Sequence, residues 1–204
     1  MKDNAGEQKD NRHRYFPMFI DSEGKRVLVI GGGSVAQRRV LTLLEFGFEV
    51  IVIAEQLTDE LRALAAEGMI LYIKGRCFVD EKPQVPPGKG TGEITQWDAE
   101  RTRMPNAESP GDLENIWIDL WTADIILACT DDRKLNKKIG AYARKKGIPV
   151  NVCDAREESS FWFPAVALNE ELTMGLVGTG EDHTAVRKAA ADLRKIIRER
   201  SYEK

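Results

Sequence analysis

The stretch VLVIGGGSVAQRR, residues 27–39, decides the fold. An apolar, β-branched run ends in three glycines, and after them Val35, Val40, Leu43 and Leu44 recur at helical spacing. β-branched residues favour a strand, and glycines favour a tight turn. The stretch therefore predicts a strand, a turn and a helix in direct succession.

The glycines have the spacing G-x-G-x-x-A. Gly31 would allow the tight turn, Gly33 would let a pyrophosphate approach the backbone, and Ala36 would let the helix pack closely on the strand. The N–H groups at the helix start would then face the phosphates. A second strand, residues 49–54, ends about 20 residues further on beside Glu55, where an acid binds the ribose hydroxyls of a dinucleotide. We therefore predict a dinucleotide site and NAD rather than NADP; a purely structural glycine turn and an ordinary surface glutamate are the alternatives.

Strand and helix patterns alternate along the rest of the chain. Apolar runs predict further strands at residues 69–75, 123–129 and 148–154, and helices are predicted over residues 34–47, 58–68 and 131–147. Asp131 and Asp132 are expected to act as N-caps of the last helix rather than as catalytic groups. Strands that are apolar throughout and separated by helices indicate a doubly wound, Rossmann-like α/β fold with a parallel sheet.

The expected organisation has four parts. Residues 1–14 are polar and charged and read as a flexible tail, and residues 15–155 form the dinucleotide-binding domain. Residues 79–115 are rich in proline, glycine and charge without a sustained period, so we expect a mobile insertion. Residues 156–204 contain two apolar runs and an amphipathic helix over about residues 184–200, which predicts a small α+β region. An appendage of this size buries its own apolar face poorly, which argues for a partner subunit.

Composition excludes several classes of protein. With 30 basic and 33 acidic residues, the net charge of −3 gives no pull toward nucleic acid or an anionic membrane. No run approaches the roughly 18 apolar residues of a membrane span, so we expect a cytoplasmic protein. The chain has three cysteines without a CxxC pair and two histidines, so no protein-held metal is expected. Cys129 and Cys153 lie in apolar runs, which favours small buried side chains over reactive thiols.

Four segments together carry a family resemblance: FID (19–21), GGGSVAQR (31–38), ACTDDRKLN (128–136) and NVCDAREESSF (151–161). They resemble the precorrin-2 dehydrogenase and sirohydrochlorin ferrochelatase family, the N-terminal module of siroheme synthase. The resemblance implies oxidation of the tetrapyrrole precorrin-2 to sirohydrochlorin with NAD, and ferrous iron insertion as a second activity with iron as substrate. It also implies that FID is a short lead strand, and that the protein is a homodimer whose dimerisation region is residues 156–204.

The resemblance assigns roles to individual residues. Asp154 matches the aspartate that the family uses for catalysis, and a carboxylate there can act as a general base; a turn-capping aspartate is the alternative. The implied cofactor contacts, beyond Gly31 and Gly33, are Ser34, Val35, Glu55, Gln56 and Thr130. Because the substrate carries many carboxylates, basic side chains are candidates for binding it, each of which could equally be a surface group: Arg38, Arg156, Arg187 and His183.

Two other functions remain open at this point. One is a non-catalytic NAD-binding regulatory module, and the other is a sirohydrochlorin chelatase or carrier without the redox step. The sequence ends at Lys204, whereas the resemblance implies a further helical domain, so we expect that domain to be absent.

Overall fold

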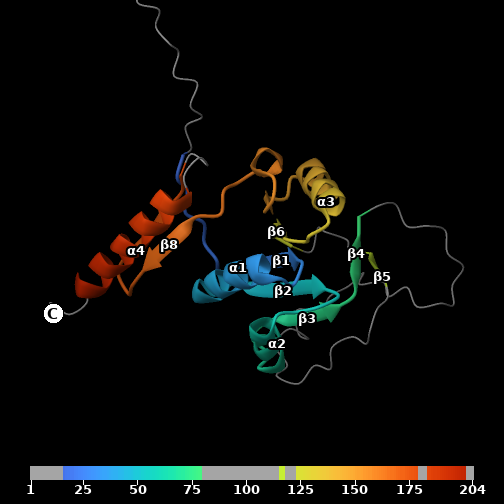
Figure 1. Ribbon diagram of the computed structural model, residues 1–204, viewed down its shortest axis with the longest axis horizontal. Helices are drawn as coiled ribbons and strands as arrows, with labels where there is room; N and C mark the ends of the chain where they lie inside the picture. Colours follow the sequence, from blue (N-terminus) through green and yellow to red (C-terminus); the bar gives the residue numbers. More distant parts are fainter. Residues whose placement is uncertain (1–15, 80–114, 118–122, 179–182, 201–204) are drawn as a thin grey trace, which may run out of the picture. The chain divides into compact units, whose positions relative to one another are not determined.

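The computed structural model of the protein describes residues 16–79, 115–117, 123–178 and 183–200 (Figure 1). The chain divides into two compact units. One spans Asp21–Trp162, and the other combines Met1–Ile20 with Phe163–Lys204. Each unit has its own sheet.

A five-stranded parallel sheet forms the centre of the larger unit. Its strands are β1 (Arg26–Ile30), β2 (Glu49–Ala54), β3 (Leu71–Lys74), β6 (Ile125–Ala128) and β7 (Val150–Val152). The order across the sheet is β3-β2-β1-β6-β7, with every neighbouring pair parallel. From β1 the chain adds β2 and β3 on one side, and it then adds β6 and β7 on the other side of β1. The strand order therefore reverses between β1 and β6. This confirms the predicted doubly wound fold and puts its ligand-binding edge at the carboxyl ends of these two strands.

Three helices flank the sheet: α1 (Ser34–Glu45), α2 (Asp59–Ala66) and α3 (Arg133–Lys146). The Thr58 hydroxyl caps α2 by accepting a hydrogen bond from Leu61 N at 3.3 Å. The Asp132 carboxylate caps α3 by accepting from two backbone N–H groups, as predicted, whereas Asp131, the other predicted cap, is not the N-cap of this helix. Both caps are of residue types that favour this role in any helix, because their side-chain oxygens reach the free N–H groups of the first turn.

Four of the sheet strands, β1, β2, β6 and β7, are buried almost throughout and supply most of the core. Val27, Val29, Ile126 and Leu127 are almost completely shielded from solvent. A buried side chain of this size contributes about 1.5–3 kcal/mol of transfer free energy. Helix α3 approaches β7 closely because Gly140 has no side chain: a Cβ there would lie 2.8 Å from Val152 Cγ2.

The chain after β7 continues along the outer edge of that strand. The N–H groups of Val150 and Val152 donate to the hydroxyls of Ser160 and Ser159, at 2.8 and 2.9 Å. Ser160 N donates in turn to the Val150 carbonyl at 2.8 Å. These bonds, with the intervening 3-10 helix η3 (Arg156–Glu158), keep the segment in the larger unit, so the boundary follows Trp162 rather than residue 155.

A second pair of strands was not predicted. β4 (Arg76–Phe78) and β5 (Asn115–Trp117) pair in parallel at the two ends of the expected insertion (Figure 1). Each strand has three residues, too few to show a periodicity. Residues 80–114, which make up most of the insertion expected at 79–115, lie outside the described residues.

The smaller unit contains a hairpin and a helix. β8 (Ala165–Leu168) and β9 (Thr173–Leu176) are antiparallel, and α4 (His183–Arg200) packs on β8. Side chains connect the two elements: Arg194 Nε donates to the Val166 carbonyl at 2.9 Å, and Asn169 Nδ2 to the Ile197 carbonyl at 3.2 Å. The predicted amphipathic helix is thus present.

The expected lead strand at residues 19–21 is wrong. These residues form no strand, and no strand of the described ranges pairs with them. The Asp21 carboxylate instead accepts a hydrogen bond from Glu23 N at 3.0 Å, which starts the turn that leads into β1. Across the described ranges, no helix is both long enough and apolar enough to cross a membrane.

Candidate functional site

Gly31 makes the turn at the end of β1. Its φ of 117° is open to glycine and strained for other residues, and a Cβ would collide with the Cys129 carbonyl at the end of β6. Its N–H donates to the Ile53 carbonyl of β2 at 2.8 Å. The glycine therefore lets the chain turn in contact with both neighbouring strands.

Gly32 holds the loop after β2 against this turn, a role that sequence reasoning missed. A Cβ on Gly32 would collide with the Gln56 carbonyl, and the Gly32 carbonyl accepts a hydrogen bond from Thr58 N at 3.0 Å. Glu55 and Gln56, the predicted cofactor-contacting pair, are both exposed in that loop. A third consecutive glycine was the available signal for this close approach.

Gly33 has open space where the other two glycines have neighbours. No heavy atom lies within 4 Å of a Cβ built there, and its φ of −84° is ordinary. The helix that starts after it, α1, has no side-chain cap, whereas α2 and α3 each have one, and its first turn contains no acidic residue. Ser34 and Val35 are exposed at this helix start. An open cradle beside an uncapped helix N-terminus fits the pyrophosphate of a dinucleotide.

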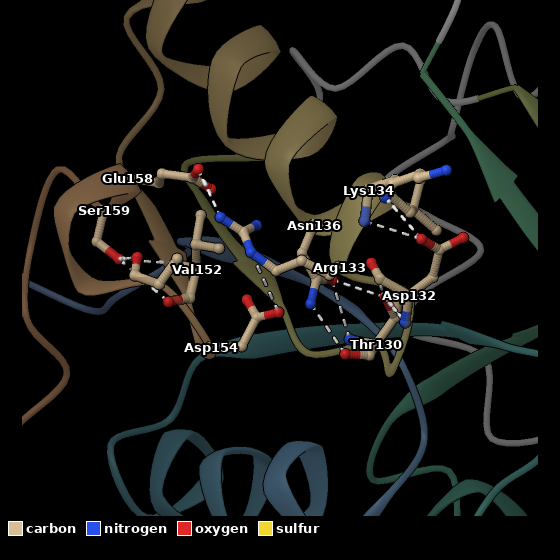
Figure 2. A network of polar contacts seen from close by, with 11 residues as sticks. Thr130, Asp132, Arg133, Lys134, Asn136, Val152, Asp154, Glu158 and Ser159 are labelled. Atoms are coloured by element: carbon tan, nitrogen blue, oxygen red, sulfur yellow. Dashed lines mark hydrogen bonds and ion pairs between the residues drawn. The ribbon is translucent and has the colours of Figure 1, made fainter.

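Thr130, at the end of β6, is held by a buried asparagine (Figure 2). Asn136 Oδ1 accepts from Thr130 Oγ1 at 2.7 Å and from Thr130 N at 3.2 Å, and Asn136 Nδ2 donates to the Thr130 carbonyl at 2.9 Å. Asn136 is completely buried, so these bonds face no competition from water. Sequence reasoning assigned no role to Asn136, although it ends the quoted ACTDDRKLN segment.

Asp154 follows β7 and keeps an accessible carboxylate. Its side chain is 37% exposed, and Arg133 Nε lies 3.9 Å from its Oδ2. Arg133 binds Glu158 more closely, with Nη2 2.6 Å from Oε1 (Figure 2). That hydrogen bond holds the pKa of Glu158 below its ordinary value. Arg133 thus provides Asp154 with a nearby positive charge without covering it.

The sheet brings most of the predicted site residues to one edge. Residues that follow parallel strands emerge on the same side of a sheet, and four strands contribute here. They are Gly31, Gly33, Ser34 and Val35 after β1, Glu55 and Gln56 after β2, Thr130 after β6, and Asp154 after β7.

Of the candidate substrate-binding residues, Arg38 and Arg156 belong to the larger unit, and His183 and Arg187 belong to the smaller one. Arg38 lies exposed on α1 with its Nε 3.4 Å from the Ser34 carbonyl, and the Arg156 guanidinium stacks over the Trp162 ring. Arg187 is exposed on α4 of the smaller unit. The side chain of His183 lies outside the described residues. These four assignments remain predictions.

Fold and glycine turn together define a Rossmann-like, dinucleotide-binding class of protein. Residues 18–165 match the family model described as "Putative NAD(P)-binding", and the chain belongs to this family. The NAD(P)-binding class predicted from the glycine spacing is thus confirmed.

Relatives connect this family to siroheme biosynthesis. The chain is 33% identical over 188 residues to "Probable multifunctional siroheme biosynthesis protein HemA" from Ruminiclostridium josui, covering 92% of this chain and 29% of that protein. It is 32% identical over 166 residues to siroheme synthase from Neisseria meningitidis serogroup C (strain 053442), covering 81% and 27%. The chain therefore spans less than a third of the length of these relatives. The resemblance stated from the quoted segments is confirmed.

A solved structure has the same fold. The structure of SirC, a precorrin-2 dehydrogenase, matches with a TM-score of 0.56 and 19% identity, over 89% of this chain and 71% of that one. The match supports the Rossmann-like architecture described above.

Proposed function

We propose that this chain is an NAD-dependent precorrin-2 dehydrogenase, which oxidises precorrin-2 to sirohydrochlorin. One observation carries the proposal: an accessible carboxylate, Asp154, shares a sheet edge with the open cradle at Gly33. The similarity of the chain to siroheme-biosynthesis proteins supports a tetrapyrrole as the substrate.

The cofactor would be held by the glycine turn and the loop after β2. The backbone at Gly33 and the first-turn N–H groups at Ser34 and Val35 would bind the pyrophosphate. Glu55 would accept hydrogen bonds from ribose hydroxyls, and its negative charge would repel a 2′-phosphate, which favours NAD over NADP. When bound, NAD supplies the hydride acceptor for the oxidation.

Asp154 would be the general base. Oxidation of a reduced tetrapyrrole removes a proton as well as a hydride, and the proton needs an accessible acceptor. The guanidinium of Arg133 lies 3.9 Å from this carboxylate and leaves it exposed to a substrate. Arg133 is itself held by Glu158, so it would stay in place as Asp154 gains and loses its proton.

Ferrous iron insertion is a second activity that the names of the siroheme-synthase relatives support. Iron entry requires the pyrrole N–H protons to leave, and Asp154 could accept them too. Iron would be a substrate here, and the macrocycle would supply its four nitrogen ligands.

The chain would act as a homodimer through its smaller unit. Within residues 16–20 of this unit, four large apolar side chains are exposed in the single chain: Phe16, Met18, Phe19 and Ile20. Leu168, Leu172 and Ile196 are also exposed in this unit, and a contact with a second copy would cover such surface.

The activity test uses precorrin-2 with NAD or NADP. We expect an absorbance change to sirohydrochlorin that is faster with NAD, followed by metal insertion when ferrous or cobaltous ion is added. NAD binding without oxidation of precorrin-2 would favour the non-catalytic regulatory module. Metal insertion into supplied sirohydrochlorin without oxidation would favour the chelatase or carrier.

A further inference from the structure

Two cysteines meet where β6 and β7 end. The last paired residues of these strands are Ala128 and Val152, and Cys153 N donates to the Ala128 carbonyl at 3.0 Å. Cys129 and Cys153 are therefore the next pair opposite each other across the two strands. Their Sγ atoms lie 2.8 Å apart as free thiols.

This position suits a disulfide without a change of the backbone. Neighbouring strands lie about 4.8 Å apart, within the roughly 4.4–6.8 Å between Cα atoms that a disulfide spans. The two sulfurs already face each other and need to approach by less than an ångström to reach the bond length of about 2.0 Å.

The two thiols differ in a way that gives each a separate task. The hydrogen bond from Cys129 and the positive charge of Arg39 lower the pKa of Cys153 to about 7, although burial and Asp154 oppose this. The same hydrogen bond and burial raise the pKa of Cys129 well above its ordinary value. Cys153 is partly exposed and Cys129 is buried. An accessible thiolate beside a second thiol is the arrangement of redox-sensitive cysteine pairs.

We propose that Cys129 and Cys153 form a redox-active dithiol that hydrogen peroxide converts to an intramolecular disulfide. The Cys153 thiolate attacks one peroxide oxygen, the O–O bond breaks, and the departing hydroxide takes up a proton to become water. Cys153 is then a sulfenic acid. The Cys129 sulfur displaces the sulfenic oxygen, which leaves with the Cys129 proton as a second water. The two sulfurs lose the two electrons that reduce the peroxide.

The bond would join the ends of two strands at the candidate site. Thr130 follows Cys129 directly, and Asp154 follows Cys153. Closing the disulfide would fix the spacing of these two backbone segments. The proposal rests on the strand register and the thiols, and it stands whether or not the chain oxidises precorrin-2.

The test is intact mass and peptide mapping of the reduced full-length chain after treatment with one equivalent of hydrogen peroxide. We expect a mass loss of two hydrogen atoms, loss of two of the three thiols, a cross-linked peptide pair containing Cys129 and Cys153, and reversal by dithiothreitol. Cys77→Ser is the matched control: Cys77 is buried, burial raises its pKa to about 12, and its replacement should leave the cross-link unchanged.

Variants of the pair separate the two steps. Cys129→Ser should stop at a sulfenic acid on Cys153 that dimedone traps, and Cys153→Ser should form neither product. Oxygen addition to wild-type Cys153 without a cross-link, a disulfide between two chains, or a cross-link that includes Cys77 would each overturn the proposal. The deciding measurement is the peptide map of the peroxide-treated wild-type chain, so a variant that fails to fold does not affect the result.

Discussion

Asp154 illustrates how a single side chain is kept both accessible and fixed in place. The serines after it saturate the edge of β7, and this anchors the turn on which it sits. Arg133 is bound at 2.6 Å to Glu158 and lies 3.9 Å from Asp154. The arrangement leaves the Asp154 carboxylate open to a substrate while an oriented cation remains beside it.

Replacing Asp154 should affect turnover far more than folding. We expect Asp154→Asn to lower the rate of precorrin-2 oxidation by about 10²- to 10⁴-fold, because the base is lost. Its unfolding temperature and its affinity for NAD should stay close to wild type, since the side chain is partly exposed. Glu157→Gln, an exposed carboxylate three residues further on, is the control and should keep full activity. Equal rates for the two variants would remove Asp154 from the mechanism.

Sequence reasoning reached residues whose role is local and missed those whose role depends on a distant partner. Asp132 was predicted as a cap because an N-cap needs only the helix that it starts. The role of Asn136 depends on Thr130 lying in reach across a turn, and that of Gly32 on the loop after β2. The sequence predicts Cys129 and Cys153 as small buried side chains, and only the strand register shows that the two meet.

At the scale of elements, three adjacent glycines do three different jobs. Gly31 permits a turn, Gly32 permits a close approach, and Gly33 leaves a space open. The first two serve the fold, and the third would serve the ligand. Substitutions at Gly31 or Gly32 should therefore lower the stability of the fold, and substitutions at Gly33 should weaken the binding of the dinucleotide.

Gly33→Val and Gly32→Val form a matched pair. Gly33→Val should keep the wild-type unfolding temperature and weaken NAD binding by about tenfold or more, because its side chain enters the open cradle. Gly32→Val should cost about 1–3 kcal/mol of unfolding free energy, because its side chain meets the Gln56 carbonyl. Titration calorimetry and thermal unfolding measure the two effects. Unchanged NAD affinity in Gly33→Val would place the cofactor elsewhere.

The contact between α3 and β7 gives a second test at this scale. Gly140→Val should lower the unfolding free energy by about 1–3 kcal/mol, since a Cβ at this position already comes within 2.8 Å of Val152 Cγ2. Ala141→Val, on the exposed side of the same helix, should cost under about 1 kcal/mol, the difference in helix propensity. Denaturant unfolding measures both; equal losses would show that α3 can move away from β7.

The elements themselves were predictable to very different degrees. The sheet strands are mostly apolar, since β1, β2, β6 and β7 are buried almost throughout, and this marks them in the sequence. β4 and β5 have no such mark: each is three residues long, and they pair across a long separation in sequence. The predicted strand at FID, residues 19–21, does not form. Two neighbouring apolar residues do not by themselves determine a strand with which to pair.

For the whole molecule, the distribution of exposed apolar side chains differs between the two units. The larger unit buries most of its apolar residues in and around the parallel sheet. In the smaller unit, Phe16 is 90% exposed and Phe19 is 68% exposed. Large apolar side chains gathered at such exposure favour an assembly over a monomer.

Light scattering after size exclusion should therefore give the mass of a dimer at micromolar concentration. The double variant Phe16→Ser, Phe19→Ser should shift the protein toward the monomer, because both side chains are exposed in the single chain and the proposed dimer contact would bury them. Met69→Ser, at an exposed apolar position of the larger unit, should leave the dimer intact. A wild-type monomer at this concentration would contradict the proposal.

The serine-covered edge of β7 also bears on how the protein behaves at high concentration. An edge strand with unsatisfied N–H groups is a template on which another chain can add a strand, and such additions grow into aggregates. At Val150 and Val152 these donors are already taken by Ser160 and Ser159 of the same chain. The turn that presents Asp154 thus also protects the edge of β7 from the addition of a strand. The same residues therefore shape the candidate site and limit aggregation of the protein.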